Sequence, residues 1–218
     1  KKGGILVGFR EKQSRYVVDM KQCPVLPEHV SDMLVPLREL IGSLSVFQQV
    51  PQIEVAVGND ENGPVTALLL RIMAPLTSED EGKLKKFADE RHVQWWLQSK
   101  GPDTISLFYP AVNTLKYVLP EFAVEMPFKP GDFTQVNPHI NQVLVSRAIR
   151  MLGIERHERV ADLFCGLGNF SLPIARQAKE VVGIEGSKTL TQRAKEGALL
   201  NGVHEKTRFE TRNLFEMT

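Results

Sequence analysis

The sequence predicts a protein of mixed α/β and α+β class. An antiparallel α+β domain is expected over residues 1–126, followed by the first half of a parallel α/β sheet over residues 127–218. Short strands and helices alternate irregularly in the first part, whereas the second part has a strand–helix–strand–helix–strand order. The pattern changes near Pro127–Pro130, where two prolines lie close together.

The bulk composition is that of a globular protein, with 218 residues, 42% of them hydrophobic and 24% charged. A net charge of only +1 excludes a broadly basic nucleic-acid binder, so any RNA contact has to be a local patch. No apolar run approaches the roughly 20 residues that a membrane span needs, and no signal peptide is visible. Two cysteines favour a reducing cytosol, and hence a cytoplasmic location, over a disulfide scaffold.

The first part is predicted to be a series of short elements. In chain order these are a hairpin of strands 5–10 and 15–19, a helix over 29–41, paired strands 51–57 and 65–73, a helix from 78 to about 91, and strands 93–98, 104–108, 115–119 and 122–126. Pro36 fits poorly inside its helix and marks a kink or an offset start. A turn-rich loop over 58–63 separates the paired strands, and Ser78-Glu79-Asp80-Glu81 has the spacing of a capping box.

The second part is predicted to begin with a helix. Asn137 can cap it with Pro138 at its first position, and Gly153 ends it. One apolar stripe of this helix is formed by Ile140, Val143, Leu144, Ala148, Met151 and Leu152. Strands 160–164, 181–184 and 207–210 then alternate with helices from about 169 and over 187–200, which predicts a parallel sheet.

A glycine turn directly follows the first of these strands, in the run VADLFCGLGNFS over residues 160–171. Gly166 and Gly168 let the backbone approach a ligand closely, and the helix behind them offers free N–H groups. Glu185, at the end of the next strand, is placed to accept hydrogen bonds from two ribose hydroxyls. The alternative for the glycines is a tight strand-to-helix turn that binds nothing.

The position of a third glycine separates two classes of cofactor. A dinucleotide site has a glycine three residues after the second one, and this chain has Ser171 there. The missing glycine weakens pyrophosphate binding and favours S-adenosylmethionine, whose sulfonium carries no phosphate. Asn169, just after the turn, can bond the amino-acid end of that cofactor instead.

Four runs together resemble the RNA uracil-5-methyltransferase family, in particular the bacterial 23S rRNA branch that carries an iron–sulfur cluster. They are DFTQVN at 132–137, DLFCGLGNF at 162–170, VGIEG at 182–186 and LNG at 200–202. The match covers most of the chain and is weaker in its first half. The resemblance implies a Rossmann-like S-adenosylmethionine-dependent methyltransferase sheet and 23S rRNA as partner, with no membrane and no DNA.

The resemblance also implies a set of cofactor-binding residues. The family pattern carries over onto Gln135, Phe164, Gly166, Gly168, Asn169, Glu185 and Asn213. Gln135 can donate to the methionine carboxylate, and Asn213 follows the third strand, where such sites contact the adenine edge. Helix capping is the alternative for Gln135 and, more strongly, for Asn137.

Cys23, in the run DMKQCPVL, resembles the last of four cysteine ligands of a [4Fe–4S] cluster in that branch. Such a cluster normally needs four thiolates, and the other three would lie before Lys1. The alternative is a small buried or surface residue. The implied metal residue is therefore Cys23 alone, in a chain that does not hold the cluster intact.

In the family, a cysteine thiolate adds to carbon 6 of uracil, carbon 5 takes the methyl group, and a carboxylate removes the carbon-5 proton before the cysteine leaves. The resemblance places both residues beyond Thr218, so we expect an internal fragment without catalytic residues and without activity. Cys165, inside the glycine turn, has no base near it in sequence and is not expected to replace the nucleophile.

The first part is a possible RNA-contacting domain. Its predicted second helix carries Lys83, Lys85, Lys86 and Arg91 close to Trp95 and Trp96, as single-stranded RNA binding would need. A solvated helix above a core tryptophan pair is favoured, because acidic residues interrupt the charge. Two other functions stay open, namely a non-catalytic RNA-binding module with a vestigial cofactor fold and an S-adenosylmethionine enzyme with another substrate.

Overall fold

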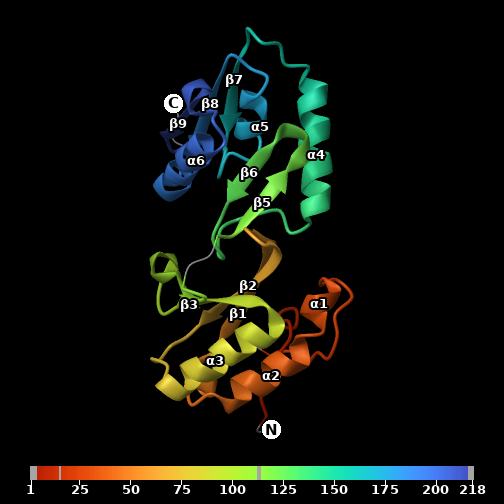
Figure 1. Cartoon of the computed structure of the whole chain (residues 1–218), viewed down its shortest axis with the longest axis vertical. Coiled ribbons are helices and arrows are strands. Elements are labelled where there is room, and N and C mark those ends of the chain that lie inside the picture. Colours follow the sequence, from red (N-terminus) through yellow and green to blue (C-terminus); the bar gives the residue numbers. More distant parts are fainter. Residues whose placement is uncertain (1–3, 15, 112–113, 216–218) are drawn as a thin grey trace. The chain divides into compact units, whose positions relative to one another are not determined.

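In a computed structural model, residues 4–14, 16–111 and 114–215 are described, and the chain divides into two compact units, Lys1–Asn113 and Thr114–Thr218 (Figure 1). The first unit contains α1 (Glu28–Ser31), α2 (Leu34–Ser43), η1 (Phe47–Gln49), β1 (Gln52–Asp60), β2 (Gly63–Arg71), α3 (Ser78–Arg91), β3 (Val93–Gln98), η2 (Pro102–Thr104) and β4 (Ser106–Tyr109). The second contains β5 (Lys116–Leu119), η3 (Pro120–Phe122), β6 (Val124–Pro127), α4 (Pro138–Leu152), β7 (Arg159–Leu163), α5 (Ser171–Ala175), β8 (Glu180–Glu185), α6 (Lys188–Leu200), η4 (His204–Lys206) and β9 (Thr207–Thr211). No helix in the described part of the chain is long and apolar enough to cross a membrane.

The sheet of the first unit is mixed, with its strands in the order β4-β3-β2-β1. The outer pairs are antiparallel as predicted, but β2 and β3 run parallel. Helix α3 connects these two strands, and a helix of 14 residues carries the chain back to the starting edge, so that β3 enters the sheet in the same direction as β2. The mixed α+β class is confirmed, and the wholly antiparallel sheet is wrong.

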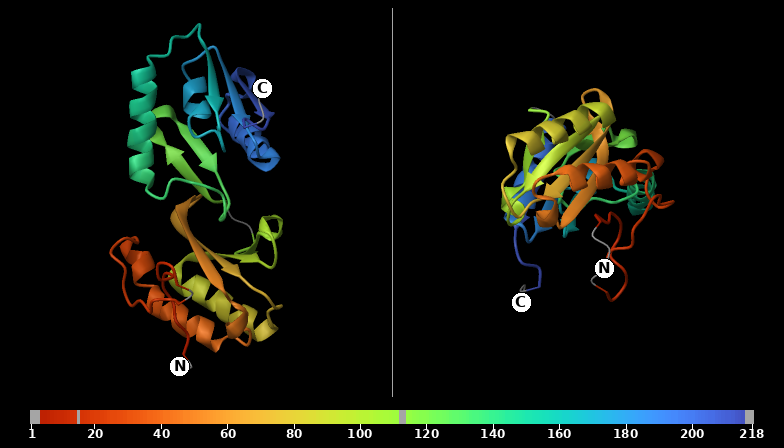
Figure 2. Two further views of the ribbon diagram at one scale, coloured as in Figure 1. Left: turned by 180° about the vertical axis from the view of Figure 1, so that it is seen from behind. Right: turned by 90° about the horizontal axis from the view of Figure 1, so that it is seen from below.

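Helices α2 and α3 cover one face of this sheet (Figure 2). The core between them and the sheet contains Leu37 and Ile41 from α2, Leu84 and Phe87 from α3, and Trp95 from β3. The Trp95 ring is fully buried, and its indole N–H donates to the carbonyl of Leu84 at 2.9 Å. The favoured interpretation of the tryptophan pair as core is therefore confirmed.

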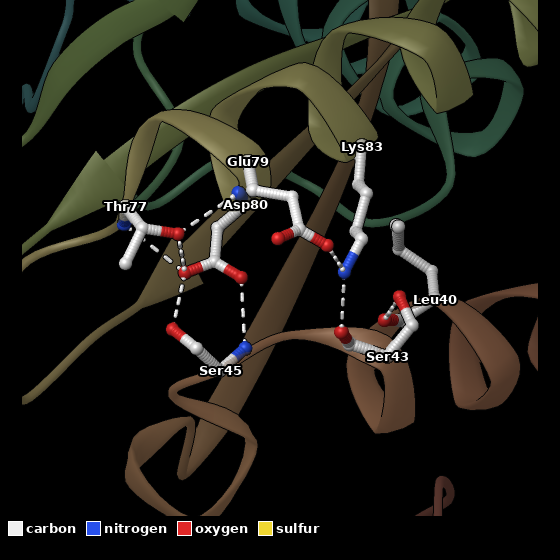
Figure 3. Close-up of polar contacts among 7 residues, drawn as sticks. All are labelled: Leu40, Ser43, Ser45, Thr77, Glu79, Asp80 and Lys83. Atoms are coloured by element: carbon white, nitrogen blue, oxygen red, sulfur yellow. Dashed lines mark hydrogen bonds and ion pairs between the residues drawn. The ribbon is translucent and has the colours of Figure 1, made fainter.

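Asp80 joins the start of α3 to the segment that follows α2 (Figure 3). Its Oδ1 accepts from the backbone N–H of Ser45 at 2.8 Å, and its Oδ2 accepts from the Ser45 hydroxyl at 2.5 Å. Thr77 and Asp80 also form a capping box, so the helix is capped one residue earlier than the sequence predicts. Burial opposes ionisation of Asp80, but the hydrogen bonds from Ser45 and Thr77 outweigh it, and the pKa of Asp80 lies well below its usual range.

Three local predictions are refined in the first unit. The N-terminal hairpin is present, because the N–H of Val18 donates to the carbonyl of Phe9, although Arg15 lies outside the described residues. The helix predicted over 29–41 is divided into α1 and α2, and Pro36 lies in the first turn of α2, which is the offset start. The loop expected over 58–63 is only a two-residue turn, since Asp60 pairs with Gly63.

The second unit contains the predicted parallel sheet, in the order β7-β8-β9. Helices α5 and α6 pack against β8 and β9. The antiparallel hairpin of β5 and β6 belongs to this unit too, because Asn201, after α6, bonds both backbone groups of Glu125 in β6. The compact unit thus begins before this hairpin, whereas the sequence places the domain boundary after it.

Helix α4 buries a different face from the predicted one. Asn137 caps it through the N–H of Ile140, and Gly153 ends it in the left-handed conformation, both as predicted. Its buried residues are Asn141, Val145 and Ile149, which follow each other at intervals of four. Most of the predicted stripe is exposed, with Met151 at 77%, because the described residues cover only the other side of the helix.

Candidate functional site

The glycine turn between β7 and α5 is the centre of the site. Gly166 has a φ of 56° and Gly168 a φ of 92°, which are conformations that favour glycine. A Cβ at Gly166 would meet nothing within 4 Å, so the backbone is bare there and open to a ligand. Phe164 enters the turn with a φ of 61°, a strained conformation for an aromatic residue and one that is concentrated at functional sites.

Glu185 links the turn to the start of the next helix. Its Oε2 accepts from the N–H of Gly166 at 3.2 Å, and its Oε1 accepts from the N–H of Ser187 at 2.9 Å. These two bonds fix the carboxylate at the carboxyl end of β8, beside the carboxyl end of β7. Each oxygen keeps lone-pair capacity for a further donor, which is what binding two hydroxyls of a ribose needs.

Ser171 occupies the position of the third glycine of a dinucleotide site. Its side chain is fully buried, and its hydroxyl donates to Oδ2 of Asp162 at 2.6 Å. Burial raises the pKa of Asp162, and the bond from Ser171 only partly offsets that effect. The serine is therefore part of the strand–helix packing, and α5 is a helix of only five residues.

Asn169 lies in a network of side-chain amides and a phenol. Its Oδ1 accepts from the Tyr117 hydroxyl at 2.9 Å and from Nδ2 of Asn141 at 3.0 Å. Its Nδ2 donates to Oδ1 of Asn141 at 2.9 Å. Asn169 therefore lies beside the turn with its amide held by β5 and α4, and no sequence motif marks either partner.

The remaining predicted residues lie around these groups. The Phe164 ring, 58% exposed, packs against Phe215, whose ring centroid is 5.6 Å away. Asn213 is exposed after β9 and accepts from the N–H of Phe215 at 3.1 Å. Phe215 was missed in the sequence because no motif position marks it.

Gln135 is exposed, and among the described residues its side chain forms no hydrogen bond or ion pair with the glycine turn. The segment that carries it is held through Asp132, which forms an ion pair with Arg193 of α6 and accepts from the N–H of Lys129 at 2.7 Å. Arg193 was also missed, because a pair so distant in sequence leaves no local signal.

Both cysteines are free and buried. Burial, with added repulsion from the charges of Asp162 and Glu185, raises the pKa of the Cys165 thiol to about 12. A thiol with that pKa is protonated at neutral pH and is a poor nucleophile. The described residues contain no group of three or more His, Cys, Asp or Glu side chains that could hold a metal ion.

A cavity of about 620 Å³ lies elsewhere in the second unit, between α4 and the β5–β6 hairpin. Its lining includes Glu121, Gln142 and Arg150 and none of the predicted site residues. The candidate cofactor site is thus an open surface at the carboxyl ends of β7 and β8, separate from this cavity.

Comparison of the sequence with known proteins finds similarity to uracil-5-methyltransferases. The sequence model of the family tRNA (Uracil-5-)-methyltransferase matches residues 119–208. The chain is 59% identical over 217 residues to the 23S rRNA (uracil(1939)-C(5))-methyltransferase RlmD of Ralstonia pickettii and covers 47% of that protein. It is 61% identical over 218 residues to the protein of the same name from Burkholderia thailandensis and covers 46% of it. The chain thus spans about half the length of the curated relatives it matches.

A solved structure with the same fold is the tRNA (uracil-54, C5)-methyltransferase of Pyrococcus abyssi in complex with S-adenosyl-L-homocysteine. The TM-score is 0.67 at 17% identity, and the alignment covers 97% of this chain and 53% of that one. The likeness supports the fold, with a Rossmann-like sheet in the second unit.

Proposed function

Because the chain is related to the RNA uracil-5-methyltransferases over about half of their length, we propose that it forms the cofactor-binding part of an enzyme that methylates carbon 5 of a uridine in 23S rRNA. The observation that carries the proposal is Glu185, whose carboxylate is fixed against the bare backbone of Gly166. The substrate is inferred from the names of the relatives. A substrate in 23S rRNA implies a cytoplasmic protein.

S-adenosylmethionine fits the groups at the site. Glu185 would take the ribose hydroxyls, Gly166 and Gly168 would lie along the cofactor, and Phe164 and Asn213 would flank the adenine. Asn169 and Gln135 offer amide groups to the amino-acid end. When bound, the cofactor supplies an electrophilic methyl group, and the chain's own residues orient it. The occupied third-glycine position, Ser171, disfavours a dinucleotide.

A binding experiment tests this proposal. Isothermal titration should show that the chain binds S-adenosylhomocysteine and does not bind NAD. Glu185→Ala should weaken binding at least about tenfold, since a carboxylate bond to a hydroxyl contributes about 1.5–3 kcal/mol. Glu180→Ala, at the other end of the same strand and paired with Arg159, is the matched control and should bind like the wild type. Equal affinity of both variants for S-adenosylhomocysteine would contradict the proposed role of Glu185.

We also propose that this chain alone does not transfer methyl groups. Both of its cysteines are buried, and Cys165 is protonated at neutral pH. Incubation with labelled S-adenosylmethionine and 23S rRNA should give no 5-methyluridine above background. Methylated uridine in that assay would show that a nucleophile is present after all.

The iron–sulfur cluster is proposed for the longer protein only. Cys23 is buried, and its backbone N–H donates to the Ser31 hydroxyl at 2.8 Å, so its position is fixed by α1. One thiolate of four would come from this residue, and the other three from outside the chain. Reconstitution of the longer protein with iron and sulfide should give cluster absorbance that Cys23→Ser reduces.

A further inference from the structure

Tyr117 determines which atom of the Asn169 side-chain amide is the acceptor and which is the donor. The two asparagine side chains pair reciprocally, because each Nδ2 donates to the other's Oδ1, at 3.0 and 2.9 Å. Reversing both amides together would preserve this pair. The pair alone therefore does not fix whether Asn169 offers a donor or an acceptor to a ligand.

The Tyr117 hydroxyl removes this ambiguity. A phenol has one O–H donor, and Oδ1 of Asn169 is its acceptor at 2.9 Å. Burial raises the pKa of Tyr117 above its usual range, so the phenol keeps its proton. With the amides reversed, this O–H would face an NH₂ group and would have no acceptor among the described residues, which is unfavourable for a half-buried hydroxyl.

The hydrogen-bond capacity of Asn169 then leaves one group available. Its Oδ1 already accepts two bonds, and one N–H of Nδ2 is used by Asn141. The second N–H has no partner in the described part of the chain. Asn169 lies one residue after Gly168, in the turn whose backbone is open at Gly166.

We infer that Tyr117 and Asn141 are positioning residues that hold the Asn169 amide so that its free N–H donates to the carboxylate of the cofactor's amino-acid end. The inference rests on the proposed function, since it specifies how the same site recognises one end of its ligand. The Tyr117 ring also packs against Phe128, with ring centroids 5.9 Å apart. An amide N–H bonded to a carboxylate is a charge-assisted hydrogen bond.

Two ligands that differ only at this end provide the test. S-adenosylhomocysteine has the amino-acid end, and 5′-methylthioadenosine lacks it. Tyr117→Phe keeps the ring and removes the hydroxyl, so the affinity for S-adenosylhomocysteine should fall about fivefold or more, while that for methylthioadenosine stays within about twofold. Tyr109→Phe removes the hydroxyl that donates to Asp89 in the first unit and should change neither affinity.

A second measurement needs no variant. In NMR spectra of the wild-type chain, the two protons of the Asn169 side-chain amide are distinct. S-adenosylhomocysteine should shift the proton that is not bonded to Asn141, and methylthioadenosine should leave it in place. Equal weakening of both ligands by Tyr117→Phe, or an unshifted Asn169 proton, would overturn the inference. A wild-type chain that binds neither ligand would instead contradict the proposed cofactor site.

Discussion

The two units of the chain differ in how completely their own side chains cover the sheet. In the first unit, α2 and α3 enclose a core around Trp95. The buried carboxylate of Asp80, near the start of α3, accepts a hydrogen bond from Ser45, which follows α2. In the second unit, Leu163 of β7 is 55% exposed. Most residues of the predicted apolar stripe of α4 are exposed as well. Glu185 and Asn169 form hydrogen bonds at the glycine turn of this unit. The first unit thus encloses its core with its own helices, whereas the second leaves apolar side chains of β7 and α4 exposed.

The largest expected effect is loss of the Asp80 junction. Asp80→Ala leaves the Ser45 and Thr77 donors without their carboxylate and should destabilise the first unit by about 3 kcal/mol. Urea unfolding followed by tryptophan fluorescence reports on this unit, because both tryptophans lie in it. Glu79→Ala is the control, since its ion pair with Lys83 is exposed and should contribute less than about 0.5 kcal/mol. A stable Asp80→Ala protein would show that the junction is not needed.

A smaller effect is expected from a methyl group in β8. A Cβ at Gly183 would lie 2.6 Å from the Phe209 ring and 2.9 Å from Sγ of Cys165. Gly183→Ala should therefore destabilise the second unit by about 2 kcal/mol and raise the reactivity of Cys165 toward a thiol reagent, mapped by mass spectrometry. Gly186→Ala has space for its methyl group and should behave like the wild type. Unchanged Cys165 labelling in Gly183→Ala would disprove the tight packing.

The tether between β6 and α6 is expected to contribute less. Asn201 bonds both backbone groups of Glu125 and the carbonyl of Gly197, so Asn201→Ala should destabilise the second unit by about 1.5 kcal/mol. The Glu125 amide should then exchange its hydrogen faster. Gln192→Ala, which removes an exposed contact with Glu196, serves as the control. If Glu125 exchange were the same in both variants, the tether would be irrelevant to stability.

The two units should also respond to acid in opposite directions. The folded-state pKa of Asp80 is lowered, so its stabilising contribution is present above about pH 4 and is lost as the pH falls through the folded pKa. The folded-state pKa of Asp162 is raised, so its contribution is fully present below about pH 4 and is lost as the pH rises through the folded pKa. Asp80→Asn and Asp162→Asn should each remove one of these dependences. Tryptophan fluorescence follows unfolding of the first unit, and amide exchange, corrected for the intrinsic effect of pH on exchange, follows the second. If the stability contributions of Asp80 and Asp162 changed with pH in the same direction, the roles given to these two carboxylates would be contradicted.

The sequence predicts the second unit more fully than the first, for a physical reason. Its strand–helix order and the cap at Asn137 follow from local preferences, and the structure confirms them. The parallel pairing of β2 with β3 depends on where the chain returns after α3, which no local pattern encodes.

The same distinction holds within the site. The sequence predicts a role for Glu185 because this residue ends the strand that follows the glycine turn. Tyr117, Asn141 and Arg193 act through partners that are distant in sequence, so only the structure brings them to Asn169 and Asp132. The exposed side of α4 shows the limit of periodicity, because an apolar stripe identifies a helix face without identifying what covers it.

The most direct test of the central claim is amide hydrogen exchange with and without S-adenosylhomocysteine. The account predicts new protection around the glycine turn at 164–169, between β8 and α6 at 185–187 and after β9 around 213–215, with none in the first unit. Protection confined to the first unit, or absent at the glycine turn, would contradict the assignment of the second unit as the cofactor-binding part.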